Sequence, residues 1–191
     1  MKTTFKNIAI LIVSFIAFSF TYSAIISKTV NTKASKITWK GYKITGSHTG
    51  QITIKSGDLI FNDDKLTGGN FVIDMTSIDV TDLEGDYKNK LEGHLKSDDF
   101  FGVNKFPTAS LSFTNVKQTG KNAYDITGNI KIKGVSKSVN FALSVYGNKA
   151  TANLKLDRTE FGIRYGSSSF FDGLKDKAIY DEFDLVVDLE F

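Results

Sequence analysis

Apolar residues recur at every second position in many short segments of this chain. In the closing segment FDLVVDLEF (183–191), every odd-numbered residue is apolar, and three of the even-numbered residues are acidic. The same alternation occurs in ATANLKL, YDITGNIKIKG and SVNFALSV, and in shorter form in KITW, QITIK, NFVIDM and SLSF. A period of two is typical of strands that bury one face and expose the other to water.

Turn sequences separate these segments. KSGD, NDDKLTGGN, KQTGKN, KGVSKS and YGNK are rich in Gly, Asn, Asp and Ser, which favour tight connections. The segments follow one another closely, so we expect a meander of hairpins. About eight strands without βα repeats predict an all-β fold with a short helix, either a sandwich or a closed barrel.

One segment has a different period. Leu83, Tyr87, Leu91 and Leu95 are four residues apart, which predicts one apolar stripe along a short helix. Thr81 and Glu84 have the spacing of a capping box at its start.

The N-terminus has the pattern of an export signal. Two lysines precede an apolar run from Ile8 to Phe20, which is short for a membrane span. Small residues upstream favour cleavage before Ala24, which gives a signal peptide over 1–23 and one mature domain over 24–191. An uncleaved anchor is the alternative. The chain has no cysteine, so lipidation of a cysteine and disulfide bonds are both excluded.

Charge argues against a nucleic-acid partner. The formal net charge of +3 falls to +1 when Lys2 and Lys6 leave with the signal, and no dense basic run occurs.

The segment HLKSDDFFGVNKFPTASLSF (94–113) leaves two interpretations open. His94 with Asp98 or Asp99 could form part of a metal site, which would suit a metal-dependent hydrolase. The simpler interpretation is a polar turn at a helix end, in which an aspartate accepts backbone hydrogen bonds. His48 and His94 share no recognisable ligand spacing, so we predict no metal site, no catalytic residues and no cofactor.

Aromatic residues and arginines gather in two long connections. Phe100 and Phe101 belong to the first, whereas Phe170 and Phe171 belong to the segment 156–183, which also holds the only two arginines, Arg158 and Arg164. A guanidinium could meet a ligand's polar head or pair with nearby acids. The aromatic surface could fill a solid core or line a ligand compartment, since small barrels can hold one small ligand.

Several of these segments together resemble the YceI-like polyisoprenoid-binding family. The resemblance rests on residues 94–113, on YDITGNIKIKGVSKSVNF, RTEFGIRYG and DEFDLVVDLEF, and on KITGSHTGQI near the start of the mature chain. It covers residues 34–191 in the family's order. It implies an antiparallel, lipocalin-like β-barrel that holds a long isoprenoid chain, in an exported and non-enzymatic protein.

From the alternating faces and this resemblance we expect an apolar cavity that holds an isoprenoid or fatty lipid, or a quinone, for transport or storage. The expected cavity residues are Trp39, Ile54, Phe71, Ile73, Leu91, Phe100, Phe101, Phe113, Ile130, Ile132, Phe141, Leu154, Phe161, Phe170, Phe171, Phe183 and Leu185. His94, Arg158 and Arg164 are the candidate contacts for the head group. A solidly packed interaction barrel stays open as an alternative, as do a transient membrane contact and a homodimer. The expected location is the periplasm, with secretion as the alternative.

Overall fold

The computed structural model describes residues 23–191. The predicted signal peptide lies outside the described residues except for Ser23, so its cleavage stays a prediction. The strands of the described part are β1 (Ile25–Thr29), β2 (Lys36–Lys43), β3 (Gly46–Asn62), β4 (Lys65–Val80), β5 (Thr108–Gln118), β6 (Ala123–Ile132), β7 (Val135–Tyr146), β8 (Lys149–Asp157) and β9 (Ile179–Glu190). The helices are α1 (Gly85–Lys96) and two 3₁₀ turns, η1 (Arg158–Phe161) and η2 (Lys175–Lys177).

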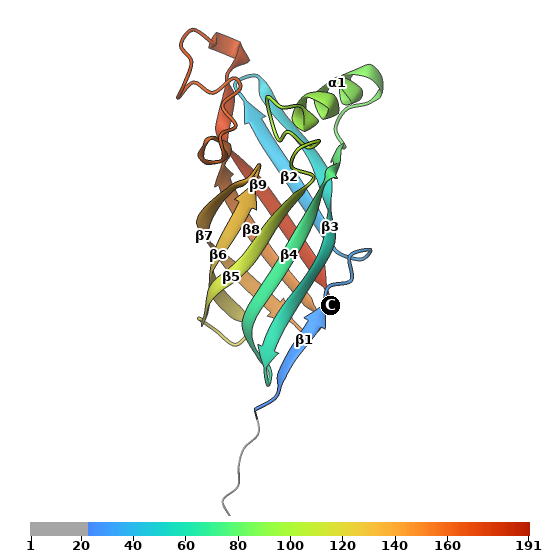
Figure 1. The fold of residues 1–191 in the computed structure, drawn as a ribbon, viewed down its shortest axis with the longest axis vertical. Coiled ribbons are helices and arrows are strands. Elements are labelled where there is room, and N and C mark those ends of the chain that lie inside the picture. The colour runs from blue at the N-terminus through green and yellow to red at the C-terminus, as the bar shows by residue number, and fades with distance from the viewer. Residues whose placement is uncertain (1–22) are drawn as a thin grey trace, which may run out of the picture.

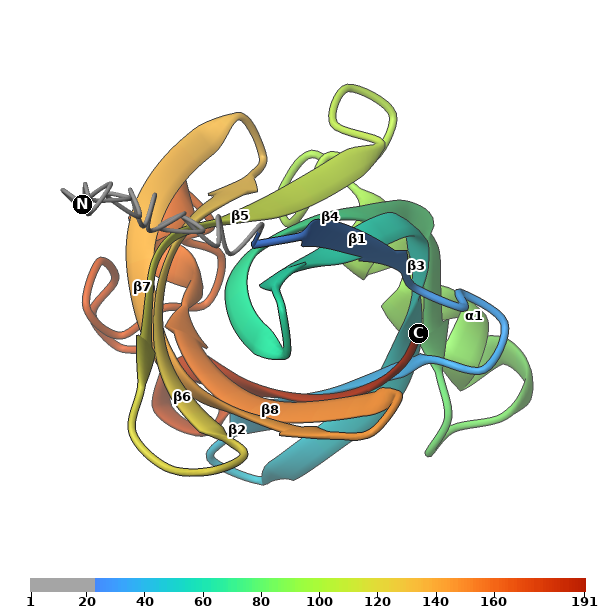
Figure 2. The same ribbon diagram turned by 90° about the horizontal axis from the view of Figure 1, so that it is seen from below.

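Eight of these strands close into an antiparallel barrel, as predicted. Strands β2 to β9 pair with their neighbours along the chain, and β9 pairs back onto β2 (Figure 1). Seen from below, they run around a ring (Figure 2). The short strand β1 lies outside this ring and pairs with the last residues of β3. The meander of hairpins that the turn sequences indicated is therefore confirmed.

The barrel has two different ends. The turns β3–β4, β5–β6 and β7–β8 lie at the end that carries β1. Helix α1 and the long connection from η1 to β9 lie at the opposite end, at the top of Figure 1. We call the half near β1 the closed half and the half below α1 the open half.

Inward side chains form two clusters that correspond to these halves. The closed half is packed by a cluster that includes Leu59, Phe61, Phe71, Tyr124 and Leu143. The open half has a smaller cluster, in which Met75, Ile78, Val103, Ala109, Ile130, Ile132, Leu156 and Phe161 are buried. Ile52, Ile73, Leu111 and Leu185 pack against both clusters, so they form the boundary between the halves.

Strands β7 and β8 separate in the open half. They pair only from Leu143 to Tyr146, and the part of β7 before Leu143 has no β8 partner. Turn η1 contacts β7 instead, and its Phe161 is buried in the cluster against which Val139 of β7 packs. A 3₁₀ turn therefore completes the wall where the sheet is interrupted.

Helix α1 forms where the four-residue spacing indicated, but its start differs from the prediction. The N-cap is Glu84, without a side-chain cap hydrogen bond, and the Thr81 hydroxyl donates to the carbonyl of Thr49 in β3. The predicted capping box is therefore wrong, because a bond to the neighbouring strand takes the hydroxyl. Tyr87, which the pattern placed on the apolar stripe, is 74% exposed.

Candidate ligand-binding site

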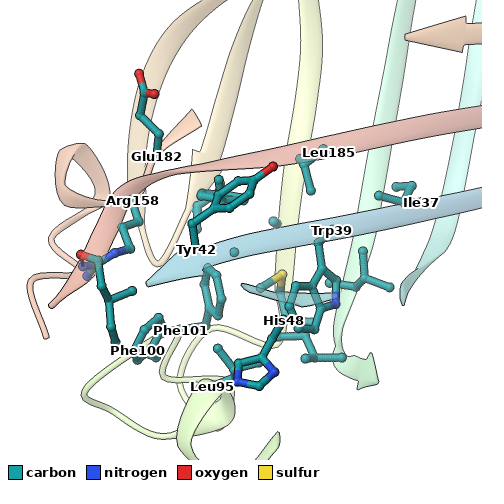
Figure 3. A pocket seen from close by; sticks show the side chains of 18 of the residues that line it. Ile37, Trp39, Tyr42, His48, Leu95, Phe100, Phe101, Arg158, Glu182 and Leu185 are labelled. Carbon is teal, nitrogen blue, oxygen red and sulfur yellow. Dashed lines mark hydrogen bonds between the residues drawn. The ribbon is translucent and has the colours of Figure 1, made fainter. Parts of the chain in front are cut away.

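The open half contains a cavity of about 310 Å³ beneath α1 (Figure 3). Its wall comes from β2, β3, β4, β5, β6 and β9, from α1 and the segment after it, and from η1. The residues that line it are Ile37, Trp39, Gly41, Tyr42, Lys43, His48, Ile52, Ile73, Met75, Ile78, Leu91, Leu95, Phe100, Phe101, Ala109, Ile130, Ile132, Arg158, Ile179, Tyr180, Glu182, Phe183 and Leu185. Most of these side chains are apolar, so the cavity suits hydrocarbon.

The floor of the cavity is the boundary between the two halves. Ile52, Ile73 and Leu185 line the cavity above and pack against the closed-half cluster below. A cavity of about 150 Å³ in another protein accommodates benzene, with its six carbons. By that measure this cavity has room for about twelve carbons, or two to three five-carbon units.

Helix α1 and the turn after it cover the cavity. The helix contributes Leu91 and Leu95, and backbone hydrogen bonds at its C-terminal end fold the chain so that Phe100 and Phe101 also face the cavity. The N–H groups of Phe101 and Val103 donate to the carbonyls of Leu95 and Lys96 at 3.1 and 3.0 Å. The structure therefore places this aromatic pair at the cavity, whereas its contact with a ligand stays a prediction.

Asp98 and His94 contribute to the shape of this turn. Lys105 bonds the Asp98 carboxylate at 2.6 Å, and Lys133 donates to the Asp98 carbonyl at 2.8 Å. The His94 ring packs edge-on against Phe100 and Tyr165, with ring centroids 5.1 and 4.4 Å apart. Within residues 23–191, no group of three His, Cys, Asp or Glu side chains is placed to hold a metal ion.

Arg158 lies in the cavity wall, but its polar atoms point into the protein. All five of its N–H groups are used: they donate to the carbonyls of Ile163, Tyr165, Ile179 and Tyr180 and to the carboxylate of Asp181, at 2.9–3.3 Å. The residue is 3% exposed, and burial lowers the pKa of its guanidinium against the opposing effect of nearby acids. Arg158 therefore has no donor left for a head group, and its predicted contact is corrected to a structural role.

His48 lies on the inward face of β3 and is fixed by an acid from the next connection. Its Nδ1 is 3.0 Å from Oδ2 of Asp82, whose Oδ1 accepts the backbone N–H of Thr49 at 3.1 Å. Partial burial acts to raise the pKa of Asp82, but the hydrogen bonds from Thr49 and His48 outweigh it and hold this pKa below its ordinary value. Asp82 is thus a stable carboxylate beside the cavity wall.

Trp39 and two glycines shape the wall around His48. The Trp39 indole N–H donates to the carbonyl of Gln51 at 3.3 Å, and the indole covers Gly50, where a Cβ would lie 2.4 Å from it. Gly41 pairs with His48 across β2 and β3, and a Cβ at Gly41 would meet no atom within 4 Å. The missing side chain of Gly41 therefore leaves open space opposite His48.

Tyr42 also lines the cavity, and its hydroxyl donates to Asp184 at 2.5 Å. This hydrogen bond, with smaller contributions from burial and the negative charge of Asp184, raises the pKa of Tyr42. Glu182, another lining residue, forms a 3.3 Å ion pair with Lys155.

The structure brings ten of the predicted site residues together at the cavity. These are Trp39, Ile73, Leu91, Phe100, Phe101, Ile130, Ile132, Arg158, Phe183 and Leu185. The other predicted residues lie elsewhere. Ile54, Phe71, Phe113, Phe141 and Leu154 belong to the closed-half cluster, because they occupy inward positions below the floor.

The aromatic residues of the η1–β9 connection also differ from the prediction. Phe161 is 2% exposed and belongs to the buried cluster of the open half, whereas Phe170 and Phe171 are 45% and 51% exposed. Arg164 stacks on the Phe170 ring at 4.5 Å, and neither Arg164 nor His94 is among the lining residues. A composition argument identified this connection as aromatic but could not tell which rings turn inward.

Comparisons with known proteins identify the family to which this closed β-barrel belongs. The YceI-like domain family matches residues 29–191, so the chain belongs to the YceI-like domain family. A "UPF0312 protein" of Azotobacter vinelandii is 46% identical over 54 residues, 28% of each chain. A "UPF0312 protein" of Pseudomonas aeruginosa is 36% identical over 104 residues, 48% of this chain and 50% of the relative. The chain thus spans about half or less of the length of these two curated relatives.

Solved structures show the same fold at low sequence identity. BcnA of Burkholderia cenocepacia has a TM-score of 0.67 and 21% identity, over 84% of this chain and 98% of BcnA. A structure described as a polyisoprenoid binding domain from Saccharophagus degradans, implicated in plant cell wall breakdown, has a TM-score of 0.61 and 13% identity. That match covers 88% of this chain and 97% of the other chain. No described helix has both the length and the hydropathy needed to cross a membrane.

Proposed function

We propose that this protein binds the apolar chain of an isoprenoid or similar amphiphilic lipid in its open-half cavity, and carries or stores that lipid. The observation that carries the proposal is the apolar cavity of about 310 Å³ beneath α1. Support comes from membership of the YceI-like family and from the fold shared with a polyisoprenoid binding domain.

The energetics favour an apolar ligand. Burial contributes about 0.8 kcal/mol per CH₂, so two or three five-carbon units contribute roughly 8–12 kcal/mol before the cost of association. An exposed ion pair contributes about 0–1 kcal/mol. The length of the buried chain therefore sets most of the affinity, and the head group mainly sets orientation.

The proposal includes no catalytic step and no cofactor. It places the mature protein in the periplasm after removal of residues 1–23, because the N-terminal sequence has the pattern of an export signal. N-terminal sequencing of the exported protein should give a start near Ala24. A retained Met1 in the membrane pellet would contradict this part of the proposal.

Extraction of the purified protein tests the main proposal. Organic extraction followed by mass spectrometry should recover an isoprenoid or related amphiphile at close to one molecule per protein. Protein stripped of lipid and refolded should then take up the recovered lipid again. Clean extracts from well-folded protein, together with no uptake of added prenyl lipids, would favour a solidly packed barrel.

A further inference from the structure

We propose that His48, held by Asp82, is the head-group site of the cavity, and that it accepts a hydrogen bond from an uncharged hydroxyl on the lipid. The inference rests on the proposed function, because it identifies where that lipid's polar end is held and which chemistry is accepted. Alcohols and phenols with a short prenyl chain are the ligands of this class.

The orientation of the His48 ring follows from its partner. An ionised carboxylate can only accept hydrogen bonds, so the contact of 3.0 Å between Nδ1 and Asp82 places a proton on Nδ1. In the neutral ring, Nε2 then carries the lone pair and acts as an acceptor. Asp82 is fixed in turn by the Thr49 N–H, so the pair is held from two sides.

Nε2 of His48 has no hydrogen-bond partner within residues 23–191. The imidazole ring of His48 lines the cavity beside apolar side chains. Trp39 and Leu95 lie in the same wall, and Figure 3 shows the three residues there. The space above Gly41, directly across the strand pair, is empty. The side chains of His48 and Asp82 are each 28% exposed, so the pair lies at the rim of the cavity rather than in its interior. In the proposed complex the lipid hydroxyl bonds Nε2 at this rim while the attached hydrocarbon occupies the cavity.

The other polar groups of the wall are already engaged. Arg158 uses all five donors within the protein, and the Tyr42 hydroxyl donates to Asp184. Glu182 pairs with Lys155. Within the described lining, His48 is thus the group that combines a fixed orientation with an unused acceptor.

Charge distinguishes a hydroxyl from an anionic head group. The Asp82 carboxylate lies directly behind His48, so a phosphate or carboxylate at Nε2 would meet a like charge and an acceptor rather than a donor. Lys43 is the cation of the wall that an anionic head would use instead. The structure therefore favours an uncharged alcohol or phenol over a phosphate at this position.

Three probes with the same number of carbons test the inference on stripped, full-length mature protein. Geraniol has ten carbons and a hydroxyl, myrcene has ten carbons and no hydroxyl, and geranyl phosphate carries an anion. Affinities are measured by displacement of a fluorescent apolar dye, with unfolding curves recorded for every variant. Wild type should bind geraniol about tenfold more tightly than myrcene, as expected for one hydrogen bond in an apolar site, and geranyl phosphate less tightly than geraniol.

Two substitutions at position 48 form a matched pair. In His48→Asn the amide can still donate to Asp82 but puts no acceptor at the place of Nε2. The ratio of geraniol affinity to myrcene affinity, both measured on this variant, should therefore fall to about one. In His48→Gln the longer amide reaches the place of Nε2, so part of the preference for geraniol over myrcene should return. Asp82→Asn should reduce the preference for geraniol over geranyl phosphate.

The outcomes separate this inference from the proposed function. If wild type and His48→Asn both bind geraniol and myrcene equally, the head-group site is wrong while the lipid cavity stands. The same conclusion follows if geranyl phosphate binds most tightly and Lys43→Ala removes that binding. If no probe binds to well-folded wild type, the proposed function itself is overturned, and the inference with it.

Discussion

The closed and open halves of this barrel have the same alternation of inward and outward residues, but one is solid and the other is hollow. In the closed half, ring pairs fill the interior: Phe71 with Phe113, and Phe113 with Phe141, have centroids 5.6 and 5.8 Å apart. In the open half, side chains from the same strands surround about 310 Å³ of space. The alternation of apolar and polar residues therefore decides which side chains point inward, but not whether these side chains pack against one another or leave a cavity.

Glycine positions explain part of the difference. In the closed half, rings cover the glycines: a Cβ at Gly57 would lie 2.7 Å from Phe71, and one at Gly69 would lie 2.9 Å from Phe113. In the open half, a Cβ at Gly41 would meet nothing within 4 Å. In the open half the indole of Trp39 likewise covers Gly50, so the difference rests on Gly41, whose missing side chain no neighbour replaces.

The largest expected effect comes from Arg158→Ala, which removes the residue that holds the η1–β9 connection to the open half. Four backbone carbonyls and Asp181 lose their donor, so we expect the free energy of unfolding to fall by about 3–5 kcal/mol. Urea unfolding measures the loss, and hydrogen exchange locates it. Amides near residues 158–181 should lose protection first, whereas those of the closed half should keep theirs.

Arg158→Lys is the matched control, because it keeps the positive charge but cannot reproduce the planar fork of donors. The Arg158→Lys variant should lose less unfolding free energy than the Arg158→Ala variant. It should still lose more than a variant with a substitution on the protein surface. Early loss of protection in β6 or β7 of the closed half would show that the two halves are not distinct in stability.

The next effect compares two partly buried phenylalanines, one in each half. Phe141→Ala removes a ring from the packed cluster and should cost about 3 kcal/mol, the low end for truncating a core phenylalanine. Phe101 already faces empty space on one side, so Phe101→Ala should cost only about 1 kcal/mol in the stripped protein. Lipid affinity should reverse the order, with about a tenfold loss for Phe101→Ala and little change for Phe141→Ala.

Unfolding curves and lipid titrations on the same stripped samples give both quantities. Equal losses of stability for the two variants would mean that the open half is packed as tightly as the closed half. A larger loss of lipid affinity for Phe141→Ala would place the ligand chain below the floor formed by Ile52, Ile73 and Leu185.

The third prediction concerns the open space at Gly41, which a larger side chain would fill. Gly41→Leu puts a side chain into open space on a strand, so the free energy of unfolding should stay within about 1 kcal/mol of wild type. Lipid affinity should fall at least about tenfold, because the new side chain occupies the volume next to His48. Lys40→Leu, one residue away and exposed, is the control that should leave affinity unchanged. Unaltered affinity in Gly41→Leu would show that the ligand does not use this space.

Most of the fold could be predicted from the sequence, because strand period and turn chemistry are local. Residues close together in the sequence indicate the all-β class, the meander and the inward faces of the strands. They also indicate the helix that contains Leu91 and Leu95. The capping box failed because its hydroxyl bonds a residue 32 positions earlier, a contact that no local pattern encodes.

The cavity was harder to predict than the barrel. Ile54 and Ile73 are opposite each other on paired strands, yet Ile73 lines the cavity and Ile54 is in the solid cluster. The alternation of apolar and polar residues predicts an inward side chain at both positions. Whether an inward side chain lines the cavity or packs in the solid cluster depends on its height along the barrel and on the size of the facing residues. His48 was passed over as a site residue because its partner Asp82 is 34 positions away, and the two meet only when β3 and the connection after β4 lie side by side.

The smallest expected effect is the pH dependence of the His48–Asp82 contact. The folded-state pKa of Asp82 lies below its ordinary value of 3.8, so folding favours the ionised form. This stabilisation is present above about pH 4 and is lost as pH falls through the lower folded-state pKa. The difference in unfolding free energy between wild type and Asp82→Asn should therefore be measurable at about pH 5 and shrink below about pH 4.

Asp125→Asn is the control in the closed half, because Asp125 is exposed and has no side-chain hydrogen bond within the described residues. Its difference in unfolding free energy from wild type should be small at every pH. Two results would show that Asp82 does not hold the wall of the open half as a carboxylate. One is a difference in unfolding free energy between wild type and Asp82→Asn that persists unchanged to pH 2, and the other is the absence of any difference at pH 5.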